Sequence, residues 1–291
     1  MRSLLFVPAA LTLLAAAPSG GGAQQKLARR IAIAADASIR ILNLAGTTRV
    51  TGWDRDSIAV SGFAPAGVNF FMGGAGRMAK LGLEPDETAK PAARGALEVR
   101  VPQRARVWIK SAEGSIEVTG VSGELDLSSV GGSIRVSGTL RLITAESIEG
   151  DIELVGASAL VRAKTGGGKL VLRHPGGDLT ASTVSGALTM SEAQPTSAVL
   201  ETVSGPVNYA GSIAPHGVLN IQTHSGDVEL LLPAEIGAEF DLQSLGGMVG
   251  VELPAKMGKP RKGKSLFFAN AGGGAQIVVR SFKGQIRVVG Q

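Results

Sequence analysis

The chain has 291 residues, with no cysteine, 41 glycines and a formal net charge of +5. The lack of cysteine excludes a disulfide framework, a cysteine-ligated metal site and a lipid anchor on an N-terminal cysteine. Glycine without a three-residue period excludes collagen, and the 44% apolar content excludes a disordered chain. The mild basic excess lacks the dense basic stripe of a nucleic-acid binder.

Residues 1–23 have the pattern of a secretory signal peptide. Arg2 supplies a short positive segment, residues 4–17 are apolar, and the small residues Gly21 and Ala23 fit cleavage after Ala23. Cleavage after Ala17 is the alternative, although Pro18 would then follow the cut. The apolar stretch is shorter than the roughly 20 residues that span a bilayer, which disfavours a retained anchor. We therefore expect an exported protein.

Residues 31–62 alternate apolar and polar side chains, as strands with one buried face do. The clearest expected strands cover 39–44 and 47–54. After a signal peptide at 1–23, we expect residues 24–291 to form a single β-solenoid domain.

Residues 63–96 interrupt the pattern with Pro65, Pro85 and Pro91 and form an insertion. Within it, the candidate partner-contact residues are Phe70, Phe71, Met72 and Arg77. Exposed apolar side chains in a repeat protein need a reason. The insertion could cap the N-terminal edge, dock on a partner or touch an anionic membrane surface, and all three alternatives stay open.

An 18-residue repeat follows the insertion. Gly114, Gly132, Gly150, Gly168 and Gly186 come at intervals of 18, and apolar residues alternate after each. Later glycines follow at intervals of 19, 21 and 21, and a second strand begins half a period on, after Gly123 and Gly177. Such a repeat predicts an all-β fold, a parallel β-helix or β-solenoid with coils of about 18 residues built from two short strands.

The alternation also predicts which side chains face the core. They are Ile116, Val118, Leu125, Leu127, Ile134, Val136, Ile152, Leu154, Leu170, Leu172, Leu179, Leu188 and Met190.

Steps of 18 from Leu127 give a column of small residues, Ala145, Ala163 and Ala181, that ends at Val199. Small residues in a column predict a thin, flattened core. We expect the corner glycines to supply positive φ angles.

On the outer face, Glu117, Arg135 and Glu153 would stack with alternating charge. Residues 256–264 hold five basic residues and predict a solvated loop before the last strands, at 277–280 and 285–289.

Sequence motifs that would indicate catalysis, nucleotide binding or metal binding are weak throughout the chain. The glycine patterns at 74–79 and 166–169 lack the context of a nucleotide-binding loop, and His174, His216 and His224 have no second histidine at metal-ligand spacing. The triad-like run 224–227 falls on a repeat corner, where Ser225 is an ordinary repeat residue.

The acidic residues give no better candidate for a catalytic or metal-binding site. Asp126, Asp151, Asp178 and Asp227 fall on different faces and coils, whereas glycan cleavage needs clustered carboxyl groups. The Gly-Gly-Asp motif at 176–178 occurs once, unlike the series that binds calcium. We expect no catalytic residues, no cofactor and no metal site.

The stretch Gly-Thr-Thr-Arg-Val-Thr-Gly-Trp-Asp at 46–54, followed by Ser-Gly-x-Ile/Val-x-Val repeats, resembles the bacterial adhesin-like β-strand-repeat family, a domain of unknown function. The resemblance covers roughly residues 40–290. It implies a β-helical or β-roll domain, exported or linked to the membrane, without established catalytic residues.

The sequence therefore leaves two functions open. The favoured one is an exported, non-catalytic scaffold or binding module in the bacterial periplasm or at the cell surface, with an envelope protein or a glycan as its partner and no nucleic acid. The alternative is a polysaccharide-acting β-helix enzyme, which would show two carboxyl groups in a cleft between adjacent coils. The oligomeric state stays open.

Overall fold

The computed structural model describes residues 24–87, 94–253 and 261–291, which form strands and turns without a helix. The strands belong to two sheets. Sheet A has 14 strands, in the spatial order β1 (Gln25–Ala32), β4 (Ser57–Ala64), β7 (Gly95–Pro102), β3 (Gly46–Trp53), β9 (Ser115–Thr119), β11 (Ile134–Ser137), β13 (Ile152–Val155), β15 (Leu170–Arg173), β17 (Leu188–Ala193), β19 (Val207–Gly211), β21 (Val228–Leu232), β27 (Ile286–Gly290), β23 (Val249–Glu252) and β24 (Arg261–Gly263).

Sheet B has 13 strands and faces sheet A. Its order is β25 (Ser265–Asn270), β22 (Ala238–Ser244), β26 (Ala275–Ser281), β20 (Val218–Thr223), β18 (Ser197–Thr202), β16 (Asp178–Thr183), β14 (Ser158–Thr165), β12 (Leu140–Ser147), β10 (Glu124–Ser129), β8 (Arg106–Lys110), β2 (Ser38–Asn43), β6 (Met78–Pro85) and β5 (Val68–Ala75).

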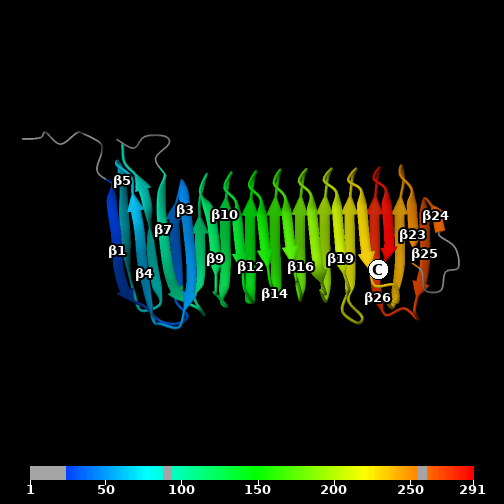
Figure 1. Ribbon diagram of the computed structural model, residues 1–291, viewed down its shortest axis with the longest axis horizontal. Coiled ribbons are helices and arrows are strands. Elements are labelled where there is room, and N and C mark those ends of the chain that lie inside the picture. Colours follow the sequence, from blue (N-terminus) through cyan, green and yellow to red (C-terminus); the bar gives the residue numbers. More distant parts are fainter. Residues whose placement is uncertain (1–23, 88–93, 254–260) are drawn as a thin grey trace, which may run out of the picture.

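From β7 to β23 the chain alternates between the two sheets, so each coil gives one strand to each. Figure 1 shows the coils stacked into a long, flat rod. Through the middle, neighbouring strands are parallel, and Ile134 pairs in register with Ile116 on one side and with Ile152 on the other, at intervals of 18 residues. The predicted β-solenoid with two-stranded coils is confirmed.

All the side chains predicted to face inward are buried, from Ile116 to Met190. One hydrophobic cluster continues through the rod, from Leu27 to Val288. Because apolar burial is the main stabilising term in folding, this continuous core holds the stack together.

The column of small residues ends differently from the prediction. Leu127, Ala145, Ala163 and Ala181 do lie in register, but the next member is Leu200 instead of Val199. The segment from Ser191 to Ser197 is one residue longer than the matching segment from Arg173 to Asp178 in the previous coil. The extra residue lies near a bulge between β17 and β19. Beyond that point, steps of 18 land on the wrong face of the sheet.

The repeat glycines occupy the corner before each sheet A strand, but for another reason than the predicted one. Gly132 and its equivalents do not have positive φ. A Cβ on Gly132 would instead lie 2.0 Å from the carbonyl oxygen of Gly114 in the previous coil, and one on Gly150 would lie 2.1 Å from that of Gly132. Positive φ occurs at the opposite corner, for example at Gly138, with 141°. Close stacking of coils is what requires the repeat glycines.

A buried hydroxyl lies three residues before each of these glycines. The Gly132 amide donates to the Ser129 hydroxyl at 3.0 Å, and the Gly205 amide donates to the Thr202 hydroxyl at the same distance. Ser129 also donates to a carbonyl of the previous coil, that of Ala112. Where these bonds form, the hydroxyls satisfy backbone groups that the tight corner would otherwise leave buried without partners.

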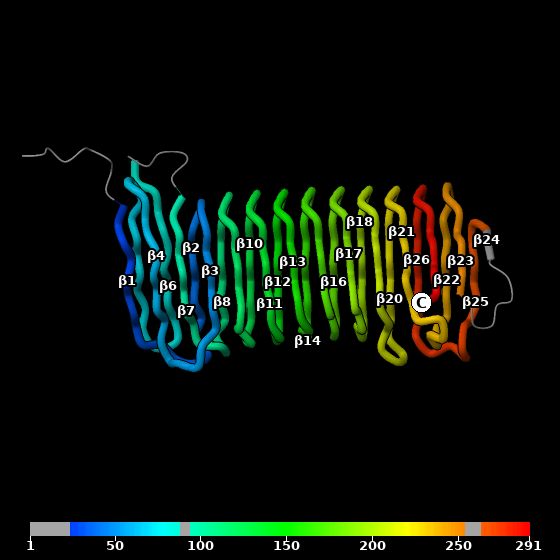
Figure 2. Tube along the Cα trace, in the orientation of Figure 1, coloured from blue at the N-terminus to red at the C-terminus, as the bar shows by residue number. Residues whose placement is uncertain are grey.

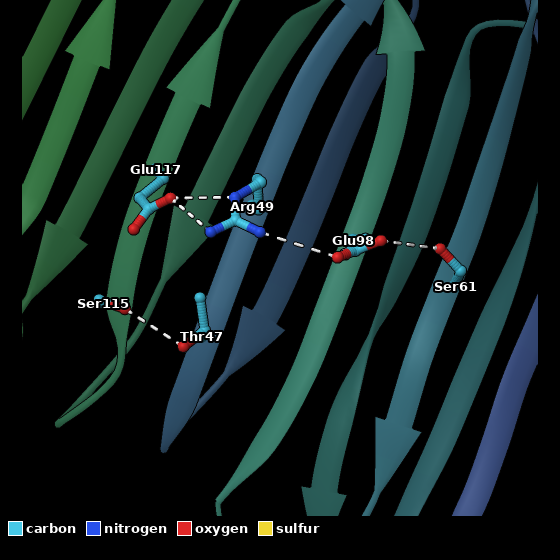
Figure 3. Close-up of polar contacts among 6 residues, drawn as sticks. All are labelled: Thr47, Arg49, Ser61, Glu98, Ser115 and Glu117. Carbon is cyan, nitrogen blue, oxygen red and sulfur yellow. Dashed lines mark hydrogen bonds and ion pairs between the residues drawn. The ribbon is translucent and has the colours of Figure 1, made fainter.

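Charged side chains form a ladder on the outer face of sheet A. Arg49 lies between Glu98, at 3.7 Å, and Glu117, at 3.0 Å (Figure 3). Arg135 continues it to Glu153, at 3.5 Å. The expected stacking of alternating charges is therefore present, although exposed pairs of this kind contribute only about 0–1 kcal/mol each.

Both ends of the rod depart from simple stacking. The coil β26–β27 lies between β20–β21 and β22–β23, although it follows both in the chain (Figure 2). At the other end, β2–β3 lies between β8–β9 and β6–β7, although it precedes both in the chain. Antiparallel strands cover each end: β4, β5 and β1 at one, β24 and β25 at the other. Such strands cover edges that would otherwise pair with other chains.

The two irregular segments join this arrangement. The insertion at 63–96 holds an antiparallel hairpin, β5–β6, and leads into β7. Of the basic segment 256–264, residues 256–260 lie outside the described residues, and Arg261–Gly263 form β24 where a loop was predicted. The predicted signal peptide also lies outside the described part. Within that part, no helix could cross a membrane.

Candidate functional site: a groove along one corner of the rod

An exposed apolar column runs along the corner where the chain leaves sheet B. Each member directly follows the buried Ser, Thr or Asn that ends a sheet B strand, and its side chain therefore points outward. The members with large apolar side chains, each between 40% and 60% exposed, are Leu44, Val130, Ile148, Val184, Val203, Phe282 and Leu245. We call this set the apolar corner stripe.

Backbone hydrogen bonds stack the stripe from coil to coil. The Ile148 amide donates to the Val130 carbonyl at 3.2 Å, and the Val184 amide donates to the Gly166 carbonyl at 3.0 Å. Ile148 therefore follows Val130, and Val203 follows Val184, at the strand spacing of about 4.8 Å. Gly166, which has no side chain, lies between Ile148 and Val184. Repeated exposed apolar side chains of this kind usually mark a binding surface.

At the C-terminal half, the stripe borders a groove, which we call the corner groove. Its opposite wall is a row of outward side chains from sheet B, the polar row: Lys164, Ser182, Glu201, Gln222, Arg280 and Gln243. The opening has a volume of about 780 Å³ and crosses β14, β16, β18, β20, β26 and β22, which are consecutive in the sheet. Ligand sites commonly have volumes of about 300–1,000 Å³.

Two stacked rings lie on the apolar wall. The rings of His224 and Phe282 have centroids 5.0 Å apart and are inclined by 16°. Phe282 is 47% exposed, so its ring is accessible to a ligand. Beneath the rings, the Ser281 hydroxyl is buried and has no hydrogen-bond partner among the described residues.

The polar row offers free hydrogen-bonding groups. Arg280 is held by Asp241, since its Nη1 donates to the Asp241 carbonyl oxygen at 2.8 Å. By contrast, the side chains of Lys164, Glu201 and Gln222 have no hydrogen-bond or ion-pair partner in the described part of the chain. The row can thus both donate to and accept from a ligand along its length.

Acidic residues are sparse in the groove. Glu201 is the one carboxylate among its described lining residues. Asp151 and Asp227 accept hydrogen bonds from the backbone amides of Lys169 and Gln285, both at 2.7 Å, and so join neighbouring coils. They are corner residues of the scaffold.

Asp126 lies on the outer face of sheet B, away from the groove lining. Partial burial raises the pKa of the Asp126 carboxyl, and the nearby Glu146 carboxylate raises it further, whereas Lys110 opposes both effects. Asp178 is exposed at the start of β16. The described residues contain no cluster of three or more acidic, histidine or cysteine side chains that could hold a metal.

The histidines and Ser225 belong to turns and corners. His174 and His216 have positive φ, 54° and 60°. The Ser225 hydroxyl donates to the Val203 carbonyl just as that of Ser204 does to Val184, which identifies Ser225 as a repeat residue.

The four predicted partner-contact residues lie at the N-terminal end, far along the rod from the groove. Phe70 and Met72, in β5, pack against the hydrophobic core, while the Lys80 ammonium lies 5.1 Å from the centroid of the Phe71 ring. Arg77 pairs with Asp36, and this contact lowers the pKa of the Asp36 carboxyl. The hairpin covers the end of the core, and contact with a partner there stays a prediction.

Sequence reasoning missed the corner groove, although the sequence carries a signal for it. The corners read Ser/Thr, then an apolar or aromatic residue, then any residue and glycine, as in 129–132, 202–205 and 281–284. The second position of this motif is neither a core position nor a turn residue. Its repeated apolar character indicates an exposed functional surface.

Comparisons with known proteins add little on function. No protein-family model and no curated protein matches the chain. A crystal structure described as a "putative cell adhesion protein" from Clostridium sporogenes aligns with 92% of this chain and 100% of its own, at 10% identity and a TM-score of 0.25. One described as a "putative adhesin" from Bacteroides fragilis aligns over 92% and 99%, at 12% identity and a TM-score of 0.43.

Proposed function

We propose that the protein is an exported, non-catalytic scaffold of the bacterial envelope that binds a glycan chain in the corner groove. The observation that carries the proposal is the pairing of an apolar wall bearing an exposed aromatic ring with a facing polar row in which Lys164, Glu201 and Gln222 have no partner among the described residues. Sugar rings match both walls, because their hydroxyl groups form hydrogen bonds at the rim and their C–H faces pack on aromatic rings.

The shape of the groove favours a polymer over a small molecule. The groove crosses six adjacent strands, which corresponds to about 24 Å at the usual strand spacing. A short ligand would leave most of the free groups of the polar row without partners. A chain laid along the rod axis would meet one new coil about every 4.8 Å.

Support for a binding role without catalysis comes from the carboxylates. Hydrolysis of a glycosidic bond ordinarily uses two carboxyl groups about 5–9.5 Å apart on either side of the bond. The described lining of the groove provides Glu201 alone. Support for export comes from the signal-like residues 1–23.

The test is binding of the mature protein to a panel of soluble envelope polysaccharides. Phe282→Ala removes the accessible ring and Gln222→Ala removes a free amide, so the double variant should bind at least tenfold more weakly. Ile148→Ala is the matched control, because Ile148 belongs to the stripe but lies outside the groove. Melting temperatures should confirm that the variants remain folded.

Three results would contradict the proposal. Equal binding by the groove variants and the control would place the site elsewhere. Release of new reducing ends from a bound polysaccharide, lost in Glu201→Gln, would favour the alternative enzyme. If no polysaccharide in the panel binds the protein, the glycan proposal fails.

A further inference from the structure

A tryptophan side chain lies on the outer face of sheet A near the N-terminal end of the rod. Trp53 ends β3 and pairs in register with Pro102 of β7. Its indole Nε1 donates to the Ser57 carbonyl oxygen of β4 at 2.8 Å, and β4 lies on the far side of β7. The indole therefore reaches across β7 and is fixed in place by this hydrogen bond.

Three guanidinium groups gather around this one ring. The Cζ atoms of Arg30, Arg55 and Arg100 lie 5.0, 5.4 and 5.9 Å from the ring centroid. Arg30 in β1 and Arg100 in β7 are both paired with Ala59 of β4, whose methyl group leaves room between them. Three segments of chain thus bring cations to a single exposed point.

None of the three guanidinium groups has a carboxylate partner within 4.0 Å in the described part of the chain. The neighbouring Arg49, by contrast, is paired with two glutamates. Asp54 and Asp56 flank Arg55 in the sequence, yet neither forms an ion pair with the cluster. Three positive charges within about 6 Å of one ring centroid repel one another, and a bound anion would reduce that repulsion.

We propose that Arg30, Arg55 and Arg100, gathered around Trp53, bind a phosphate group. Guanidinium groups bind phosphate oxygens through paired, charge-assisted hydrogen bonds, and arginine clusters are a recurring way to hold a doubly charged phosphate. Cation–π attraction to the indole keeps the three guanidinium groups near one ring. The site lies on the opposite sheet from the corner groove and is independent of the glycan proposal.

Trp53 itself provides the readout. The chain has two tryptophans, and Trp108→Phe leaves Trp53 as the remaining one. In this background, inorganic phosphate should produce a saturable change in fluorescence that sodium chloride at equal ionic strength does not. Arg30→Gln with Arg100→Gln should weaken the phosphate affinity at least tenfold, because two of the three charge-assisted contacts are lost.

A matched control is available on sheet B. The Arg40 guanidinium lies 4.6 Å from the Trp108 ring centroid, as a single cation–indole pair. In a Trp53→Phe background, Trp108 should not respond to phosphate. In the Trp108→Phe background, Arg40→Gln should leave the phosphate response of Trp53 unchanged.

Vesicles distinguish the source of the phosphate. Co-sedimentation with phosphatidylglycerol vesicles but not with phosphatidylcholine, lost in the Arg30→Gln, Arg100→Gln variant, would assign the site to a lipid headgroup. Binding of inorganic phosphate alone would assign it to a soluble phosphate. Absence of both responses, or an equal response to chloride, would overturn the proposal.

Discussion

The glycine at each repeat corner can be tested with a pair of neighbouring substitutions. In Gly132→Ala, the added methyl group would lie 2.0 Å from the Gly114 oxygen, 2.5 Å from the Gly114 carbonyl carbon and 3.0 Å from the Ser129 hydroxyl oxygen. In Gly131→Ala, the same methyl group would have no atom within 4 Å, and the backbone there lies outside the positive-φ region. Both changes insert one methyl group in the same turn.

The expected effects have opposite signs. A methyl group at Gly132 forces two coils apart, and overpacking of this kind costs about 1–3 kcal/mol. It also strains the bond from the Gly132 amide to Ser129 and the nearby bond from the Ile116 amide to the Ser133 carbonyl, at about 1 kcal/mol each. We expect Gly132→Ala to lower the free energy of unfolding by about 3–5 kcal/mol. Gly131→Ala should raise it by about 0.4–1 kcal/mol, since alanine restricts the unfolded chain.

Urea denaturation followed by circular dichroism measures both values. Because stacked repeats can unfold in steps, hydrogen exchange at the Ile116 and Ile134 amides should be measured alongside, and it should accelerate in Gly132→Ala alone. If the two variants differ by less than about 1 kcal/mol, close coil stacking does not explain the repeat glycines.

Two further predictions concern the core. Ile134→Asp should cost several kcal/mol because it buries a charge, whereas Arg135→Ser, on the outer face, should cost about 0.5 kcal/mol or less; equal losses in thermal melts would mean that the two faces are exchanged. Burial raises the pKa of Tyr209, the one tyrosine of the chain, well above its usual value of about 10, so an absorbance titration of the folded protein should show no ionisation near pH 10. As the pH rises, the unfolded chain loses the Tyr209 phenol proton before the folded chain does. The contribution of Tyr209 to the free energy of unfolding is therefore fully present below pH 10 and declines as the pH rises above 10. Ionisation of Tyr209 near pH 10 in the folded protein would refute the assignment.

The regular coils could be predicted from sequence because their signal is local. Alternation after each glycine fixes which side chain faces inward, and Ile116, Ile134 and Ile152 repeat at one interval. The prediction failed where the interval changed, at Val199. A single residue added in a turn leaves no mark on the strands that flank it, yet it shifts every later pairing by one.

Other features depend on distant parts of the chain. A glycine permits both a positive φ and close backbone contact, and only the position of Gly114 reveals which of the two Gly132 serves. The insertion of β26–β27 between earlier coils likewise leaves no local pattern. The convergence of Arg30 and Arg100 on Trp53 depends on the strand order at the N-terminal end, which the repeat does not encode.

The placement of β26–β27 also constrains the order in which the protein can fold. Coil β22–β23 cannot dock directly on β20–β21, because the space between them belongs to residues 275–290, which are synthesised later. Folding that advances coil by coil from the N-terminal side must therefore pause with an open slot, which closes only when the last strands enter it. Contacts that form late in folding slow unfolding more than they speed folding. The C-terminal end of the rod should accordingly act as a kinetic latch that protects the stack from unravelling.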